Sequence, residues 1–192
     1  MFYWIAWVIL RTFLTLFCRY RIEGLENVPR EGGVILVANH RAMMDPIVIG
    51  CSIHFRRTYF MAKEELFRFK PFAFLIRALG AFPVKRKKVD RTALYTAEAI
   101  LREGKLLLIF GEGTRNRDLS KVLGELHSGF VYLATKTNVP VVPVYTFNTH
   151  QIFFKIFRWP KVIVRFGRPI VEKEDLLEKT RSALIELGAG GE

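Results

Sequence analysis

Short apolar runs recur along the chain and are separated by polar and amphipathic segments. The runs VILVA at 34–38 and LLLIF at 106–110 contain only apolar residues, as is typical of strands buried on both faces of a sheet. Weaker strand patterns occur at 59–62, 82–84, 139–145 and 162–166. The segment 139–145 contains two prolines, so we expect an irregular strand there or one at a sheet edge.

Helical periodicity appears between these runs. The segment 90–102 has an amphipathic pattern and is soon followed by Gly104, a residue type that commonly ends helices. A second helix is expected at 128–137, and a third at 173–187 with its leucines on one side. The alternation predicts an α/β fold in which a single mixed sheet is flanked by helices. In open α/β sheets, ligands bind beyond the carboxyl ends of the strands.

The first 18 residues differ from the rest of the chain. They are mostly apolar and rich in Trp and Phe, but Arg11 interrupts them after ten residues, whereas a membrane span needs about 20 apolar residues. We therefore divide the chain into a membrane-docking helical leader at 1–18 and an α/β domain at 19–192. We expect an amphipathic helix that lies in one leaflet, with Arg11 reaching the headgroups. A short span and an ordinary core helix remain as alternatives.

Charge narrows the set of partners. The 192 residues include 30 Lys and Arg against 18 Asp and Glu, a net charge of +12, which suits nucleic acid, an anionic membrane or acidic small molecules. Apolar residues make up 51% of the chain and charged residues 25%, so a disordered chain is excluded. Cys18 and Cys51 lie in apolar stretches, and we expect both to be packing thiols.

A histidine and an aspartate follow the strand VILVA. His40 lies just beyond this strand, and Asp45 comes five residues later, directly before Pro46. Because the residue before a proline avoids the helical region, we expect a turn at Asp45 that folds its carboxylate toward the imidazole. A carboxylate on Nδ1 leaves Nε2 as a base, and no Ser or Cys adjoins His40 to act as a nucleophile. The alternative is a pair of residues that only caps a turn.

Two further strand ends contain candidate phosphate ligands. GEGTRNR at 111–117 follows LLLIF, and KRKK at 85–88 follows the strand expected at 82–84. Small residues let the backbone approach a ligand, and basic side chains suit phosphate oxygens. The candidate ligands are Lys85, Arg86, Glu112, Gly113, Thr114 and Arg115. Taken alone, each segment is equally explained as a solvated loop.

Together these segments resemble the four sequence blocks of the glycerolipid acyltransferase family. The family's NHxxxxD block matches His40 and Asp45, and its FPEGTRS block matches 110–116. A G-x-x-F-x-x-R-like block matches 80–86 and a V-P-[IV]-[IV]-P-V block matches 139–144, so that all four occur in the family's order. The resemblance extends over most of the α/β domain.

The chain departs from the family pattern at two positions. Gly111 stands where the family usually has proline, and Asn116 stands where it usually has serine. The first exchange bears on the stiffness of the loop and not on its charges, and the second replaces one small polar residue by another. The combination of four blocks in the same order therefore stays highly specific.

The resemblance implies a reaction and a site. A fatty acyl group would pass from acyl-CoA or acyl-acyl carrier protein to the sn-2 hydroxyl of 1-acylglycerol-3-phosphate (lysophosphatidic acid), giving phosphatidic acid. His40 would be the general base and Asp45 would orient it, with direct attack and no acyl-enzyme. The implied substrate-binding residues are Lys85, Arg86, Glu112, Gly113, Thr114 and Arg115. Glu112 would orient an arginine or bind a glycerol hydroxyl, since its charge does not suit a phosphate.

The resemblance also implies the surroundings of the reaction. The partners would be membrane lipids, the lysolipid and the thioester donor, at the cytoplasmic face of the cell membrane. No cofactor or metal is implied beyond the thioester co-substrate. We further hypothesise that the apolar segment 72–79, between two of the blocks, lines the acyl-chain pocket; ordinary core packing is the alternative.

Three other functions remain to be weighed. The acceptor could be glycerol-3-phosphate or another lysolipid. A basic nucleic-acid-binding protein would show aromatics among the basic residues of a cleft, whereas here they concentrate in the leader, so we expect no nucleic-acid partner. A membrane scaffold without catalysis leaves the placement of His40 and Asp45 unexplained.

Overall fold

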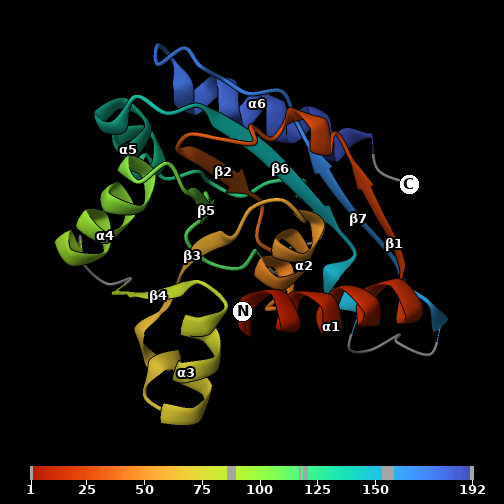
Figure 1. Ribbon diagram of the computed structural model, residues 1–192. Helices are drawn as coiled ribbons and strands as arrows, with labels where there is room; N and C mark the ends of the chain where they lie inside the picture. Colours follow the sequence, from red (N-terminus) through yellow and green to blue (C-terminus); the bar gives the residue numbers. More distant parts are fainter. Residues whose placement is uncertain (1, 86–89, 117, 119–120, 153–157, 191–192) are drawn as a thin grey trace.

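The computed structural model describes residues 2–85, 90–116, 118, 121–152 and 158–190. They form one seven-stranded sheet with helices on both faces (Figure 1), which confirms the single mixed sheet expected from the sequence. The strands are β1 (Arg19–Glu23), β2 (Val34–Ala38), β3 (Thr58–Lys63), β4 (Ala81–Val84), β5 (Leu106–Phe110), β6 (Val141–Phe147) and β7 (Lys161–Phe166). The helices are α1 (Phe2–Phe17), α2 (Asp45–Ser52), α3 (Lys70–Ala78), α4 (Arg91–Arg102), α5 (Gly129–Thr137) and α6 (Leu176–Ala189), and the 3-10 segments are η1 (Leu25–Asn27), η2 (Glu64–Phe67) and η3 (Thr149–Gln151).

Strand direction brings the predicted site segments to one edge of the sheet. The strand order is β1-β7-β6-β2-β5-β3-β4, and every neighbouring pair is parallel except the antiparallel pair β6–β7. The strands β2 to β6 therefore end at the same edge, and β1 and β7 end at the opposite edge. The segments that follow β2, β4 and β5 all leave the sheet at the first of these edges.

The proline-containing strand β6 is neither irregular nor at an edge, contrary to our expectation. It lies inside the sheet between β2 and β7. Pro143 comes one residue before the first β6–β7 pair, in which Val144 faces Phe166, and its carbonyl accepts a hydrogen bond from the Gly167 N–H at 2.8 Å. A residue with an N–H at this position would place it at the end of the β6–β7 ladder. The inner strand β6 can therefore contain Pro143 without losing a hydrogen bond within that ladder.

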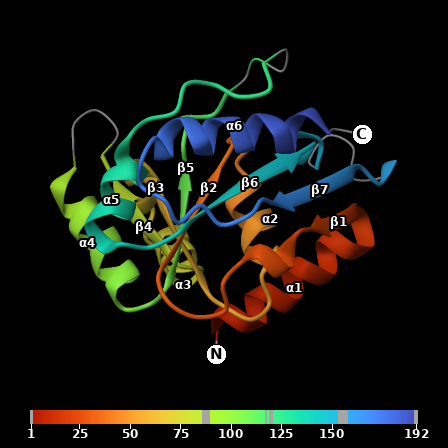
Figure 2. The same ribbon diagram turned by 90° about the horizontal axis from the view of Figure 1, so that it is seen from above.

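Two apolar cores cover the two faces of the sheet, and Figure 2 shows α1 and α6 on opposite sides of it. On one face, α1 and α2 contribute Leu14, Val48 and Ile49 to a core that includes alternate residues of β2 and β5. On the other face, α4, α5 and α6 pack on the intervening residues of the same strands. Burial on both faces explains why VILVA and LLLIF contain no polar position.

Several elements differ from the sequence-based expectations, among them helix α3, which was expected only as an apolar segment. The sequence assigned no strand to Arg19–Glu23, which forms the edge strand β1. We expected a turn at Asp45, but helix α2 begins there and the turn comes just before it. The helix can begin at this position because proline is well tolerated in the first turn of a helix. Helix α6 begins three residues later than expected, since Asp175 has a left-handed backbone (φ 50°) that precedes the helix.

The leader forms α1, which packs with α2 on one face of the sheet in what we call the α1–α2 core. Polar as well as apolar side chains of α1 make contacts there. The Trp7 indole N–H donates to the Gly50 carbonyl at 3.1 Å, and the Arg11 guanidinium donates to the Cys51 carbonyl at 3.0 Å. The guanidinium also lies 4.7 Å from the centre of the Tyr20 ring. Arg11 thus points into the protein, in contrast to our expectation that it reaches the headgroups. Within the part of the chain that the structure describes, no helix has the length and apolar character needed to cross a bilayer.

The two cysteines are packing residues, as expected. Cys18 and Cys51 are buried free thiols in the α1–α2 core. Burial raises the pKa of Cys51 to about 12, so its thiolate is scarce at neutral pH and the thiol is a poor nucleophile.

Helix α1 contributes to stability through its inner face, and two leucines provide a matched test. Leu14 is 1% exposed and Leu16 is 60% exposed. Leu14→Ala should lower the free energy of unfolding by about 2–5 kcal/mol, whereas Leu16→Ala should change it by less than about 0.5 kcal/mol. Chemical denaturation measures both values. Equal effects of the two substitutions would show that α1 is not part of the core.

Candidate active site

The end of strand β2 is anchored to β6 by an asparagine. Asn39 is fully buried, and its side-chain amide pairs with the backbone of Thr146: Nδ2 donates to the Thr146 carbonyl at 3.1 Å, and Oδ1 accepts the Thr146 N–H at 2.8 Å. This side chain continues the β2–β6 pairing beyond the last strand residue. The backbone that enters His40 is therefore fixed on the β6 side.

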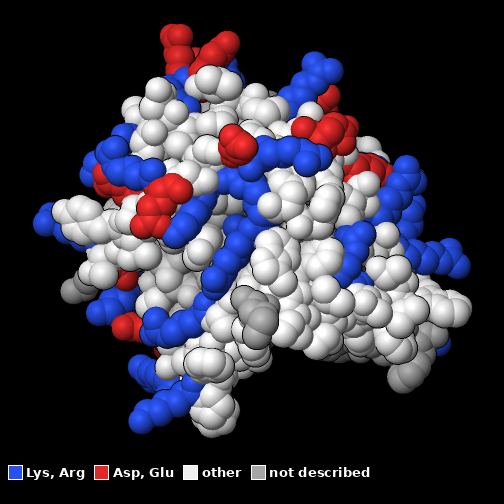
Figure 3. Space-filling view, viewed as in Figure 1, with Lys and Arg blue, Asp and Glu red and all other residues white. Residues whose placement is uncertain are grey.

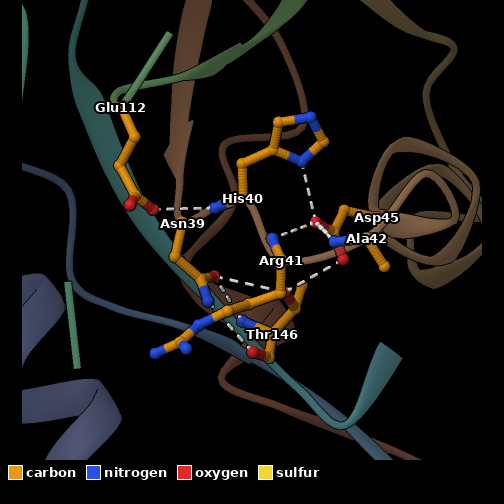
Figure 4. Close-up of polar contacts among 7 residues, drawn as sticks. All are labelled: Asn39, His40, Arg41, Ala42, Asp45, Glu112 and Thr146. Atoms are coloured by element: carbon orange, nitrogen blue, oxygen red, sulfur yellow. Dashed lines mark hydrogen bonds and ion pairs between the residues drawn. The ribbon is translucent and has the colours of Figure 1, made fainter. Parts of the chain in front are cut away.

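The structure brings the predicted pair His40 and Asp45 together. Asp45 Oδ2 lies 2.8 Å from His40 Nδ1, and Asp45 is fully buried. The same oxygen accepts the backbone N–H groups of Arg41 at 2.6 Å and Ala42 at 2.8 Å (Figure 4). The turn before α2 thus wraps around the carboxylate and fixes its position. Because the carboxylate accepts from Nδ1, the lone pair of the neutral imidazole is on Nε2, which points away from Asp45 in Figure 4.

The imidazole is also held by an aromatic ring. The rings of His40 and Phe110 stack with centroids 4.0 Å apart and an angle of 22° between their planes. Phe110 ends β5, the neighbour of β2, and its backbone faces Ala38. Only 8% of the His40 side chain is exposed. The ring is therefore held by the carboxylate and by Phe110, and Nε2 is the ring nitrogen that does not contact Asp45.

Glu112 makes its hydrogen bonds to backbone groups. It is buried, and its two carboxylate oxygens accept the backbone N–H groups of His40 and Gly124, each at 2.9 Å. The Asn116 N–H in turn donates to the His40 carbonyl at 2.8 Å. The contacts of this carboxylate therefore link the His40 turn to the loop after β5, instead of orienting an arginine. The sequence offered no sign of this, since the linked amides are 72 and 12 residues away.

Arg41 makes a further link that sequence analysis missed. Its guanidinium donates to the carbonyls of Asp118, Lys121 and Val122 at 2.5–3.2 Å. The Tyr145 hydroxyl, from β6, donates to the Val122 carbonyl at 2.7 Å. Arg41 thus holds the far part of the same loop. In the sequence, its position directly after His40 was the only sign of this role.

The predicted phosphate ligands are dispersed along the edge of the sheet. Thr114 and Arg115 are exposed on the loop after β5, directly before the Asn116 N–H that donates to His40. Gly113, with a left-handed backbone (φ 64°), allows the tight turn in front of them. Lys85 follows β4, two strands from β5 and so about 10 Å away. Arg86 lies outside the described residues.

Two apolar hollows adjoin this edge. A narrow crevice of about 30 Å³ is walled by α1, α2 and β3 and includes Pro46, the neighbour of Asp45. A larger pocket of about 280 Å³ lies on the α4–α5 side and includes Phe110 and Thr114. Of the segment 72–79, Leu79 borders the crevice, and the acyl-pocket hypothesis for this segment stays a prediction. Phe72, Phe74 and Leu75 from the same segment are exposed.

Comparison with known proteins identifies the family. Residues 19–146 match the family described as Acyltransferase. The chain is 29% identical to the 1-acyl-sn-glycerol-3-phosphate acyltransferase of Borreliella burgdorferi, over 86% of this chain and 70% of the relative. It is 27% identical to the Bacillus subtilis enzyme of the same name, over 84% of this chain and 78% of the relative.

A solved structure with the same fold agrees with the sequence comparison. The crystal structure of the 1-acyl-sn-glycerophosphate acyltransferase PlsC from Thermotoga maritima matches with a TM-score of 0.72 and 27% identity, over 95% of this chain and 78% of that one. The matched region contains the His40–Asp45 pair and the loop after β5 that is joined to it. The chain therefore belongs to the acyltransferase family.

Proposed function

We propose that this acyltransferase transfers a fatty acyl group from an acyl thioester to the sn-2 hydroxyl of 1-acylglycerol-3-phosphate, giving phosphatidic acid. The observation that carries the proposal is the contact of His40 Nδ1 with a buried carboxylate that two backbone N–H groups also hold. The names of the relatives support the acceptor. The direct test is formation of phosphatidic acid from a labelled thioester and lysophosphatidic acid.

The proposed chemistry uses Nε2 of His40 twice. It takes the proton of the acceptor hydroxyl as that oxygen attacks the thioester carbonyl carbon. Collapse of the tetrahedral intermediate breaks the carbon–sulfur bond, and the leaving thiolate receives the proton from Nε2. Asp45 stabilises the imidazolium between the two steps. The substrate hydroxyl is the nucleophile, and the buried Cys51, with its raised pKa, is unsuited to that part.

The acceptor phosphate is assigned to the loop after β5. Arg115 and Thr114 are exposed on this loop, and the Asn116–His40 bond joins the loop to the base. A phosphate on Arg115 would place the glycerol hydroxyl near His40, since the two residues follow the adjacent parallel strands β5 and β2. Lys85 and Arg86 remain proposed ligands, from the more distant β4 end.

The proposed donor is acyl-CoA or acyl-acyl carrier protein, and the proposed place is the cytoplasmic face of the cell membrane. Both donors are anionic, which suits the net charge of +12. Helix α1 would hold the protein on the bilayer through its exposed apolar side chains. The narrow crevice between α1 and α2 would have to widen to admit a lipid tail from that side.

Removal of the base should abolish activity. His40→Ala should lower kcat by about 10²–10⁴-fold, and Asp45→Asn should also leave little activity, because an amide can favour the wrong tautomer. The readout is phosphatidic acid formation, with circular dichroism as a check of folding. His54→Ala, at an exposed histidine elsewhere on the chain, is the control. Near-wild-type turnover in a folded His40→Ala protein would refute the general-base assignment.

Loss of the loop arginine should weaken acceptor binding. Arg115→Ala removes a charged hydrogen-bond donor and should raise the acceptor KM about tenfold or more, while the donor KM stays the same. Lysolipid titration at fixed donor measures it. Arg102→Ala, at an exposed arginine on α4, is the matched control. The phosphate assignment fails if Arg115→Ala leaves the acceptor KM unchanged.

The kinetics of a Glu112→Gln variant should show whether this residue positions the His40 turn or binds substrate. In Glu112→Gln, one of the two backbone N–H groups would face an amide NH2 instead of an oxygen. We expect kcat to fall by roughly ten- to a hundredfold with little change in the acceptor KM, because the His40 turn is displaced. Glu125→Gln, at an exposed glutamate that follows Gly124 in the chain, is the control. A raised acceptor KM at normal kcat would instead support the substrate-binding role expected from the sequence.

A further inference from the structure

Helix α3 presents large apolar side chains to the surface. Of its two buried residues, Ala73 and Ile76, the second belongs to a small satellite core beside β3 and β4. Phe69, which precedes the helix, and Phe74 are each 69% exposed. Single exposed apolar residues are common, but a contiguous group indicates an interaction surface.

Helix α1 also exposes apolar side chains, while two of its polar groups face the protein. The Trp7 indole and the Arg11 guanidinium bond to the backbone of α2. Its outer face is apolar and includes Ile5, Val8 and Ile9, the last of which is 63% exposed. A surface helix normally has the opposite arrangement. The outer face of α1 is therefore suited to an apolar environment.

Direct contacts join the two helices into one surface. The rings of Phe2 and Phe74 lie edge to face with centroids 6.2 Å apart. The Arg57 guanidinium donates to the carbonyls of Arg77 and Ala78 at the end of α3, and it lies 5.1 Å from the centre of the Tyr3 ring of α1. Arg57 thus fixes the end of α3 beside the start of α1. The two helices would meet a partner together.

Charge indicates the nature of that partner. The segments 2–17 and 66–79 contain no Asp or Glu, whereas 66–79 contains the exposed basic residues Arg68, Lys70 and Arg77. Figure 3 shows a largely white surface over α1, and Lys and Arg side chains beside white ones in the region of α3. An apolar surface with a basic border is complementary to an anionic bilayer, where each basic group adds to binding.

We propose that α3, together with the preceding Phe69, is a second membrane-docking element that inserts beside α1 into a bilayer containing anionic lipid. This inference rests on the proposed membrane site of α1 and deepens it. A second copy of the chain is a less suitable occupant, because pairing this face would bring the basic borders of two copies together. Docking through both helices would present the crevice bordered by Tyr3 and Leu79 to the lipid.

Vesicle binding of three variants and one control variant tests the inference. Phe74→Ser should lower the partition coefficient about tenfold or more on phosphatidylcholine vesicles that contain phosphatidylglycerol, as Ile9→Ser on α1 should. Tyr95→Ser, at an exposed aromatic on α4, is the matched control and should bind as wild type. Lys70→Gln should bind roughly fivefold more weakly to the mixed vesicles and unchanged to pure phosphatidylcholine. Turnover of a water-soluble short-chain acceptor should stay normal in all of them.

The outcomes separate this inference from the proposed function. Normal binding by Phe74→Ser with weak binding by Ile9→Ser overturns the role of α3 and leaves α1 as the anchor. Normal binding by both overturns the membrane site as well. A wild-type dimer that Phe74→Ser dissociates without loss of vesicle binding would show that a second copy covers the face.

A labelling measurement keeps the test decisive if Phe74→Ser folds poorly. Because Cys18 and Cys51 are buried, Phe74→Cys provides one accessible thiol for an environment-sensitive dye. We expect a blue shift of the dye emission on addition of the mixed vesicles, and none for the same dye on Tyr95→Cys. Equal emission with and without vesicles at position 74 contradicts the inference.

Discussion

The carboxylate of Asp45 is fully buried, and a buried carboxylate is costly unless hydrogen-bond donors surround it. The fold meets this requirement with the His40 ring and with the backbone N–H groups of Arg41 and Ala42. These donors are available only if the chain turns tightly between β2 and α2. The geometry of the His40 ring therefore follows from satisfying one buried acid, and Pro46 suits the first turn of α2, which begins at Asp45.

The rest of the site is built around this turn by side chains that bond to backbone. Asn39 ties it to β6, Glu112 ties it to the loop after β5, and Arg41 ties it to the end of that loop. Each side chain supplies the correct donor or acceptor for backbone groups that no strand or helix satisfies. A substrate would thus meet a base whose position is determined from three sides, which lowers the cost of orienting it.

The sequence predicted the sheet, its buried strands and the His40–Asp45 pair because those depend on local pattern. It did not predict the links of Glu112 and Arg41, which depend on segments 72 and 80 residues apart meeting at one sheet edge. It misjudged β6, since a sequence does not show whether the missing N–H of Pro143 faces a partner. It also misjudged Arg11, because an apolar helix with one arginine is equally compatible with a guanidinium that bonds inward.

The central claim is that His40 activates the acceptor hydroxyl directly, without an acyl-enzyme. Rapid-mixing measurement of thiol release from the thioester, with and without lysophosphatidic acid, tests it most directly. The account predicts that thiol release requires the acceptor and that mass spectrometry finds the protein unmodified when donor alone is present. A stoichiometric burst of thiol without acceptor, together with an acylated residue, would contradict it.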